Sequence, residues 1–361
     1  MTVQESIREP ATEQMTRLAG ACRVIRAKVK PAVSGGWVER ARPEAVLTEA
    51  VESRRVVVLS AMAGSGKTTL VAAAARRLER PVAWLTVDCT DDAPGRLVTY
   101  LEAALAVVVP GVQGVVRDAS AARIPPPEVA GRLVEAMAGE QVVLVVDELE
   151  RLGDGSEGWG VMQAALRRAP SDMAFVLCSR GSVPARVLPR GPDEVGWLGD
   201  AVLALTVEEA GHVLAALGRP TVDPAAAVEA TGGWVTGVLF EAWRLGEQAA
   251  GDGQEDSLYD YLTAHIVGEL PAGDRDFLVA TSVLTEVTAD RAAAIGVREA
   301  GARMASLRSA HIPAEWKDGG RALRCHPRLR EYLQDCLESW GAERLRQLQM
   351  RHRRLLVSEG R

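Results

Sequence analysis

Nine residues near the start of the chain, Ala61–Thr69, restrict its possible folds more than any other stretch. They read Ala-Met-Ala-Gly-Ser-Gly-Lys-Thr-Thr, follow the apolar run Val56–Leu59 and lead into an alanine-rich run at 71–78. A strand, a glycine-containing loop and a helix in this order are the parts of a phosphate-binding P-loop. Gly64 and Gly66 let the backbone aim its N–H groups at one point, which the positive end of the following helix also faces. The alternative is a chance glycine-rich turn.

The P-loop supplies most of the predicted nucleotide site. Lys67 provides a mobile charge for the β- and γ-phosphates, the Thr68 hydroxyl can ligate Mg²⁺, and Thr69 lies near the α-phosphate. The predicted phosphate-binding residues are Ala63, Gly64, Ser65, Gly66, Lys67, Thr68 and Thr69. One position departs from the usual pattern, because the residue six places before the lysine is Ala61 instead of glycine.

A second apolar run, Val142–Val146, ends in Asp147 and Glu148. A nucleotide-bound Mg²⁺ needs a carboxylate at the end of a strand beside the P-loop strand, and Asp147 is predicted to hold it directly or through water. Glu148 can orient and deprotonate the attacking water. Asp88 also follows a predicted strand, but Asp147 is preferred because its strand is wholly apolar and its carboxylate is paired. The alternative is an acidic cap on a buried strand.

The next predicted strand, 174–180, ends at Arg180. In P-loop ATPases with an additional strand, a polar residue at this place senses the γ-phosphate, and an arginine there also stabilises transition-state charge. The predicted catalytic residues are therefore Lys67, Asp147, Glu148 and Arg180. An ordinary surface arginine at a strand end is the alternative interpretation.

Predicted strands alternate with predicted helices from about residue 56 to residue 180. The strands are 56–59, 82–87, 142–146 and 174–180, and the helices are 42–52, 71–78, 96–108, 127–137 and 161–168, with a loop at 121–128. This order predicts an α/β fold with a doubly wound parallel sheet. Residues 24–29 and 201–205 are predicted as additional short strands, and 31–37 as a loop.

Helices dominate after residue 205. Thr206 and Glu209 have the spacing of a capping box that opens a helix to residue 217. Further helices are predicted at 223–230, 235–248, 259–269, 272–283, 289–294, 327–340 and 343–357, with a hairpin wing around 317–325. From spacing alone, His326 at the end of the wing is a structural histidine, and Trp234 is core packing at a loop–helix junction.

The composition suits a soluble chain with two or three domains, since 361 residues are 47% hydrophobic. The net charge of −6 argues against a chain built wholly around nucleic acid, although residues 321–361 carry ten arginines against five acids. The five cysteines form no C-x-x-C pair, and the first fourteen residues have no apolar signal core. We therefore expect a cytoplasmic protein that does not associate with a membrane.

These residues together resemble the nucleotide-binding module of STAND (signal transduction ATPase) proteins, in the branch of MalT and the large ATP-binding LuxR-type (LAL) regulators. The stretch 61–69 matches, including the alanine at its first position. Further matching segments, in chain order, are 25–31, 36–40, 84–88, 100–101, 146–148, 177–180, 233–237 and 326–333.

The resemblance covers about residues 22–361 and implies a P-loop NTPase domain, a small helical domain and a winged-helix domain. The expected boundaries are a flexible tail at 1–21, then 22–192, 193–268 and 269–340, with the start of a helical sensor-type arm at 341–361. It implies ATP or ADP with Mg²⁺ as cofactor, Arg180 as the reader of the γ-phosphate, and His326 as a contact to the ADP β-phosphate. Val38 and Arg40 are expected beside the adenine, mainly through their backbone.

The implied function is a signal-transduction ATPase switch. ADP holds a closed monomer, ATP opens it and permits self-association, and slow hydrolysis resets it. The inducer is expected to bind a sensor domain, and DNA an effector domain, and this chain is expected to lack both. The chain is therefore expected to be either a piece of a longer protein or a short relative. An ATP-dependent winged-helix DNA-binding protein and a P-loop small-molecule kinase are the alternatives.

Overall fold

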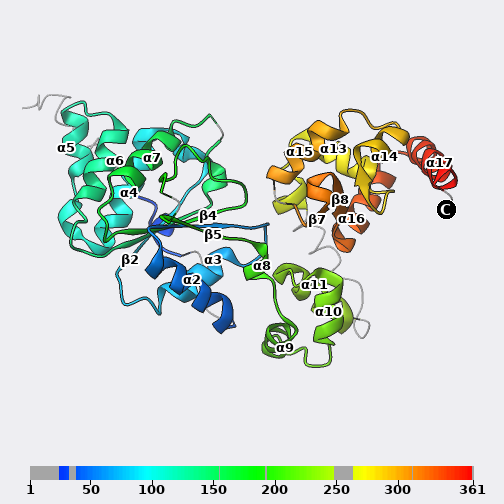
Figure 1. The fold of residues 1–361 in the computed structure, drawn as a ribbon, viewed down its shortest axis with the longest axis horizontal. Coiled ribbons are helices and arrows are strands. Elements are labelled where there is room, and N and C mark those ends of the chain that lie inside the picture. The colour runs from blue at the N-terminus through cyan, green and yellow to red at the C-terminus, as the bar shows by residue number, and fades with distance from the viewer. Residues whose placement is uncertain are drawn as a thin grey trace, which may run out of the picture.

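The computed structural model describes residues 24–31, 38–153, 155–191, 193–247, 263–310 and 312–359. Its central element is a five-stranded parallel sheet with the order β2-β3-β4-β1-β5 (Figure 1). The strands are β1 (Val56–Ser60), β2 (Val82–Thr86), β3 (Val143–Asp147), β4 (Ala174–Ser179) and β5 (Val195–Leu198). Because all five run in one direction, the carboxyl ends of β1, β3 and β4 meet at the same edge.

Helices cover both faces of this sheet, because alternate side chains of a strand point to opposite faces. Val57 and Leu59 pack in a core with residues of α2 (Ala41–Ser53) and α3 (Lys67–Ala75). Val56 and Val58 pack in a second core with residues of α4 (Pro94–Val108), α5 (Val115–Ala121), α6 (Pro126–Glu135) and α7 (Gly158–Arg168). The predicted doubly wound α/β fold is confirmed.

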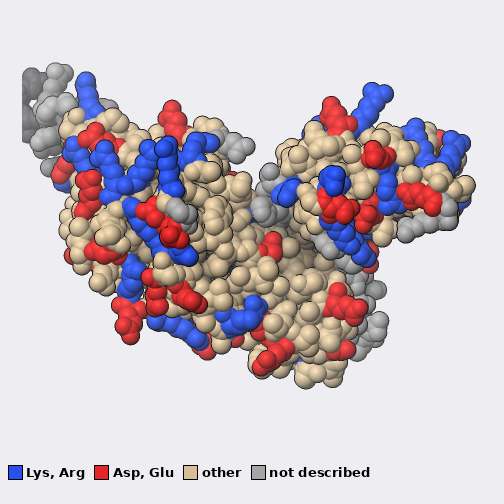
Figure 2. All heavy atoms as spheres, in the orientation of Figure 1, with Lys and Arg blue, Asp and Glu red and all other residues tan. Residues whose placement is uncertain are grey.

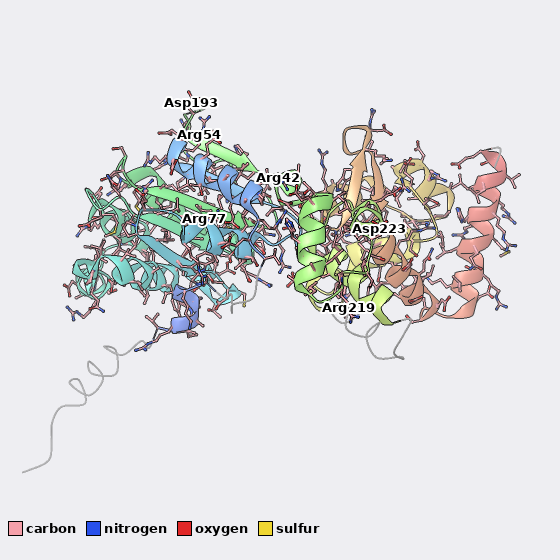
Figure 3. All side chains as sticks on the ribbon, turned by 90° about the horizontal axis from the view of Figure 1, so that it is seen from below. Arg42, Arg54, Arg77, Asp193, Arg219 and Asp223 are labelled. Atoms are coloured by element: carbon pink, nitrogen blue, oxygen red, sulfur yellow. The ribbon has the colours of Figure 1, made fainter. Side chains whose placement is uncertain are left out.

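A small bundle follows the sheet. It contains α8 (Asp200–Leu203), α9 (Val207–Ala216), α10 (Pro224–Thr231) and α11 (Val235–Glu247). Thr206 and Glu209 form the predicted capping box at the start of α9. Arg42, at the start of α2, faces this bundle and lies 3.0 Å from the Glu209 carboxylate (Figure 3). The bundle is thereby attached to the sheet domain by an ion pair as well as by the chain.

The last part is a winged-helix domain, as predicted. Its elements are α13 (Ala272–Thr281), β6 (Val287–Thr288), α14 (Ala289–Ala294), α15 (Ala300–Ser309), β7 (Ala314–Lys317), β8 (Ala322–Cys325) and α16 (Pro327–Glu338). The strands form an antiparallel sheet with the order β6-β8-β7, whose β7–β8 hairpin is the expected wing. α17 (Ala342–Ser358) follows. Ala63 of the P-loop and Trp234 belong to the same apolar cluster as the winged-helix core.

Several predicted elements were wrong. Residues 26–29 form a 3-10 helix instead of a strand. The apolar stretch 201–205 is not a strand, because residues 200–203 form α8 and Leu203 packs into the core beside α2. The additional strand is β5, which was not predicted, and neither were α5 and α15.

The expected helix at 259–269 is only partly covered: residues 259–262 lie outside the described residues, and Thr263–Val267 is a π-helix. The predicted tail and residues 32–37 of the predicted loop at 31–37 also lie outside them. In the described part of the chain, no helix combines the length and the apolarity that crossing a bilayer requires.

Candidate nucleotide-binding site

The P-loop connects β1 to α3 in the predicted conformation. Gly64 has φ 67° and Gly66 has φ 86°, the left-handed region that glycine adopts without strain. Ser65 is buried, and its hydroxyl oxygen has no hydrogen-bond partner among the described residues. A buried hydroxyl at the start of a helix is left for a ligand oxygen to satisfy, which fits a phosphate group.

Lys67 is turned onto the loop that carries it. Its ammonium donates to the carbonyl oxygens of Ala61 at 2.6 Å and of Met62 at 2.9 Å. Burial lowers the pKa of Lys67 below its ordinary value, and the carboxylate of Glu150 is the largest influence in the opposite direction. A phosphate anion in the loop would supply the negative charge that a buried ammonium lacks.

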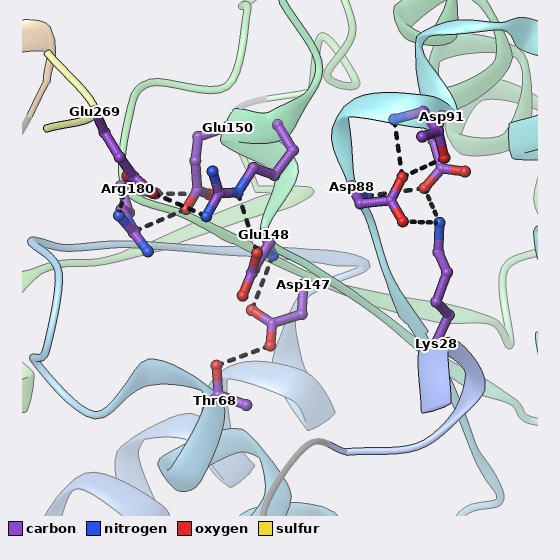
Figure 4. A network of polar contacts seen from close by, with 11 residues as sticks. Lys28, Thr68, Asp88, Asp91, Asp147, Glu148, Glu150, Arg180 and Glu269 are labelled. Carbon is purple, nitrogen blue, oxygen red and sulfur yellow. Dashed lines mark hydrogen bonds and ion pairs between the residues drawn. The ribbon is translucent and has the colours of Figure 1, made fainter. Parts of the chain in front are cut away.

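The predicted Mg²⁺ ligands are brought together. The Thr68 hydroxyl donates to Asp147 Oδ2 at 2.8 Å, across the junction between α3 and β3 (Figure 4). Asp147 is 3% exposed, and burial raises the pKa of its carboxyl, an effect that the Thr68 hydrogen bond opposes. A hydroxyl and a carboxylate at this distance fit the oxygen ligands that Mg²⁺ requires.

Glu148 and Arg180 lie at the same edge of the sheet but are engaged with other side chains. Glu148 has φ 57° and forms an ion pair of 3.2 Å with Arg151. Arg180 binds the Glu150 carboxylate with its backbone N–H at 3.1 Å and its Nε at 3.0 Å. Sequence reasoning missed Glu150, although its signal is visible: an acid three residues after Asp147 returns to the same edge.

Arg180 and Arg151 share a further partner in Glu269, which lies just before α13. Arg180 Nη1 donates to one oxygen of this carboxylate, and Arg151 Nη2 lies 3.0 Å from the other (Figure 4). Burial would lower the pKa of Arg151, but the carboxylates of Glu269 and Glu148 raise it above its ordinary value. No motif or spacing in the sequence connects Glu269 with this site.

The start of α11 binds the P-loop from the opposite side. The indole N–H of Trp234 donates to the carbonyl of Ala63 at 2.9 Å, and the Thr236 hydroxyl donates to the carbonyl of Gly64 at 2.8 Å. Trp234 is buried, as expected for core packing, but the hydrogen bond gives it a second role that sequence reasoning missed. Asp200 is another missed residue, because its Oδ1 accepts the backbone N–H of Met62 at 2.9 Å.

His326 lies at the carboxyl end of the wing, against Trp234. The two rings meet edge to face, with centroids 5.4 Å apart. Both residues line a cavity of about 390 Å³ between the P-loop, the small bundle and the wing. Its walls are formed by Met62, Ser65, Asp200, Leu203, Ala204, residues 229–235, Pro313, Ala314 and residues 324–326. His326 is thus on the cavity that the P-loop faces, 259 residues further along the chain than Lys67.

Val38 and Arg40 are not among the residues that line this cavity. Val38 packs against the core of the small bundle. The Arg40 guanidinium lies 2.9 Å from Glu209, and the Arg40 backbone N–H donates to Glu44 at 2.7 Å. Their expected contact with adenine stays a prediction.

Two family models match the chain. Residues 37–177 match an AAA ATPase domain, and residues 263–346 match the MalT winged helix domain. The first match contains the P-loop and Asp147, and the second contains His326 and Glu269. The small bundle, which supplies most of the remaining cavity walls, lies between the two matched ranges.

The chain is also similar to the serine/threonine-protein kinase PknK of Mycobacterium tuberculosis and of Mycobacterium bovis. It is 25% identical over 363 aligned positions, which cover 91% of this chain and 31% of the relative. The chain spans less than a third of the length of the curated relatives it matches.

Among solved structures, the Walker-type ATPase of Pyrococcus abyssi aligns with a TM-score of 0.55 and 15% identity, over 82% of this chain and 95% of that protein. This likeness shows the fold. A STAND protein with a tetratricopeptide repeat sensor from Pyrococcus horikoshii aligns over 94% of this chain and 47% of its own, with a TM-score of 0.42 and 14% identity.

Proposed function

Because one part of the chain matches an AAA ATPase domain and another matches the MalT winged helix domain, we propose that it is a MalT-like STAND module that acts as an adenine-nucleotide switch. One observation carries the proposal: Met62 and Ser65 of the P-loop and His326 of the winged-helix domain line one cavity of about 390 Å³. A ligand bound to the P-loop there reaches both domains. Its binding is then linked to their arrangement.

The P-loop residues bind the phosphates in this proposal. The backbone N–H groups of Gly64–Thr69 and the Ser65 hydroxyl donate hydrogen bonds to the phosphate oxygens, and Lys67 leaves the Ala61 carbonyl to pair with them. Mg²⁺, when bound, neutralises phosphate charge, and Thr68 and Asp147 are the residues that would hold it. Glu148 orients the attacking water, and Arg180 contacts the γ-phosphate.

The two nucleotides act differently because only ATP offers a γ-phosphate. In the ADP state, His326 donates a hydrogen bond to the β-phosphate, and this contact keeps the winged-helix domain against the P-loop. In the ATP state, Arg180 binds the γ-phosphate, the His326 contact is lost, and the winged-helix domain separates and permits self-association. Slow hydrolysis then restores the first state. A ligand shifts such an equilibrium only by its differential contacts, and His326 and Arg180 are those contacts here.

The test compares nucleotide affinities of His326→Ala and of the matched control His212→Ala, which removes an exposed histidine on α9. Loss of a hydrogen bond to a charged phosphate should weaken ADP binding about tenfold or more. ATP binding should change less, and the control should match the parent. Lys67→Ala should remove the binding of both nucleotides.

The contact fails as an explanation if His326→Ala holds ADP as firmly as the parent. Unchanged ATP binding by Lys67→Ala would refute the P-loop assignment itself. The affinities of all variants for ADP and for ATP can be measured by titration with fluorescent nucleotide analogues.

The alternative of an ATPase that loads the protein onto DNA rests on the positive segment 321–361. In that segment Arg346 pairs with Glu343, and Glu359 pairs with Arg291 of α14. Basic and acidic side chains are interspersed on the face of the molecule drawn in Figure 2. Nanomolar duplex binding that weakens steeply with salt would favour this alternative.

A further inference from the structure

Glu269 pairs with two arginines, and one of them, Arg151, also pairs with the predicted catalytic residue Glu148. One of its oxygens pairs with Arg180 and the other with Arg151 (Figure 4). It lies between the π-helix that ends at Val267 and the start of α13 at Ala272, in the part of the chain that matches the MalT winged helix domain. One carboxylate from the second domain therefore engages two cations at the carboxyl edge of the sheet.

Each of these arginines also binds a carboxylate of the sheet domain. Arg180 Nε lies 3.0 Å from Glu150, and Arg151 Nε lies 3.2 Å from Glu148. The five side chains form an unbroken series, Glu148–Arg151–Glu269–Arg180–Glu150, with three negative and two positive charges. Removing Glu269 from the series would take one carboxylate from each arginine and leave the Arg180–Glu150 and Arg151–Glu148 pairs in place.

The series lies beside the phosphate site. Glu150, Arg180 and Asp147 are close enough to Lys67 to affect its pKa. The Arg180 side chain is 19% exposed and the Glu269 side chain 31% exposed, so water screens their attraction less than it screens that of a fully exposed pair.

A carboxylate and a phosphate use the same donors of an arginine. The guanidinium presents its N–H groups as a planar fork that fits either anion. A γ-phosphate that approaches Arg180 must therefore compete with Glu269 for this fork. ADP has no γ-phosphate and leaves the Arg180–Glu269 pair intact.

We propose that Glu269 is a specificity-determining residue that competes with the γ-phosphate for Arg180 and so sets the preference of the site for ADP over ATP. The inference rests on the proposed nucleotide switch and adds a second contact to it. His326 favours ADP through a contact to its β-phosphate that is lost in the ATP state. Glu269 disfavours ATP because it occupies the arginine that the γ-phosphate binds. By linkage, ATP that binds Arg180 also weakens the attachment of the winged-helix domain at Glu269.

The test is Glu269→Gln, which keeps the shape of the side chain and removes its charge. The affinities for ADP and for a slowly hydrolysed ATP analogue are measured with Mg²⁺ for the parent, for this variant and for Glu338→Gln. Glu338 is an exposed glutamate on α16 and serves as the matched control. Glu269→Asp keeps the charge on a shorter side chain. Its ratio of ATP-analogue affinity to ADP affinity should lie between those of the parent and of Glu269→Gln.

We expect Glu269→Gln to bind the ATP analogue about three- to fivefold more tightly, relative to ADP, than the parent does. If the ion pair is merely structural, Glu269→Gln changes the ADP and ATP-analogue affinities by the same factor or leaves both unchanged. Either result overturns the inference. If the parent binds neither nucleotide, the proposed function fails and this inference with it. If the parent binds both and the ratio is the same in Glu269→Gln, the inference alone fails.

Discussion

At the scale of single residues, Lys28 connects the start of the described chain to the end of β2. Its ammonium lies 3.0 Å from Asp88 and also pairs with Asp91, which is fully buried (Figure 4). Lys28 also lies over the Tyr100 ring, 4.1 Å from its centroid. This cluster fixes the 3-10 helix at 26–29 against β2, which is the outermost strand on one side of the sheet.

The titration of Asp88 gives this cluster a pH-dependent signature. Burial raises its pKa, but hydrogen bonds from Thr90 and the contact with Lys28 outweigh burial and lower the pKa from 3.8 to about 2. A group whose pKa is lowered by folding stabilises the fold above its unfolded pKa and loses this effect as the pH falls towards its folded pKa. The stabilisation by Asp88 should therefore be complete above about pH 5 and disappear between 3.8 and about 2.

The measurement is the free energy of unfolding of the parent and of Asp88→Asn, from denaturant titrations between about pH 6 and pH 3. The parent should be the more stable protein at the upper end, and the difference should shrink as the pH falls. If the difference in unfolding free energy between the parent and Asp88→Asn stays constant over this range, the charge of Asp88 does not stabilise the fold.

At the scale of elements, the docking of α11 on the P-loop depends on its first turn. Gly233 has φ 76°, and a Cβ there would lie 2.5 Å from the Leu205 carbonyl oxygen, so only glycine fits. The residue that follows is Trp234, whose indole N–H reaches the carbonyl of Ala63. The glycine thus places the tryptophan against the loop.

Trp234→Phe should weaken nucleotide binding several-fold, because it removes the hydrogen bond to Ala63 while keeping an aromatic ring in the core. A buried hydrogen bond contributes about 1 kcal/mol, and its loss leaves the Ala63 carbonyl unsatisfied. Trp84→Phe is the matched control, since the Trp84 indole donates at 2.9 Å to Thr86 within β2. Calorimetric titration with ADP should separate the two variants, and equal affinities in both would remove Trp234 from the site.

Elements with strong local signals could be predicted from the sequence. The P-loop, the wholly apolar β3 and the capping box of α9 each depend on residues close in the chain. β5 could not, because it has four residues, includes Gly196 and is recognisable only by its pairing with β1. The apolar residues 201–205 indicated a strand, but Asp200 binds the P-loop backbone and Leu203 enters the core from a helical turn.

The candidate site divides in the same way. Thr68, Asp147 and Arg180 follow strands that end at one edge, so their meeting could be predicted from strand order alone. Glu150 was missed although its spacing of three residues from Asp147 returns it to the same edge. Trp234 and Glu269 join the site through contacts across domains, and no spacing in the sequence encodes such contacts. His326 was expected from the resemblance, and the structure places it on the same cavity as Ser65 of the P-loop.

At the scale of the whole molecule, the winged-helix domain meets the candidate nucleotide site at two places. His326 approaches the cavity beside Trp234, and Glu269 approaches the sheet edge beside Arg180. Both contacts are made by polar side chains that a phosphate can replace or bind. In the proposed switch, a γ-phosphate that binds Arg180 therefore acts on the arrangement of domains without unfolding either one.

Small-angle X-ray scattering of the chain saturated with ADP and with a slowly hydrolysed ATP analogue, extrapolated to zero concentration, tests the switch most directly. The proposed switch predicts a larger radius of gyration with the ATP analogue than with ADP. For Lys67→Ala, neither nucleotide should change the radius of gyration. Identical scattering curves for the parent with both bound nucleotides would contradict it.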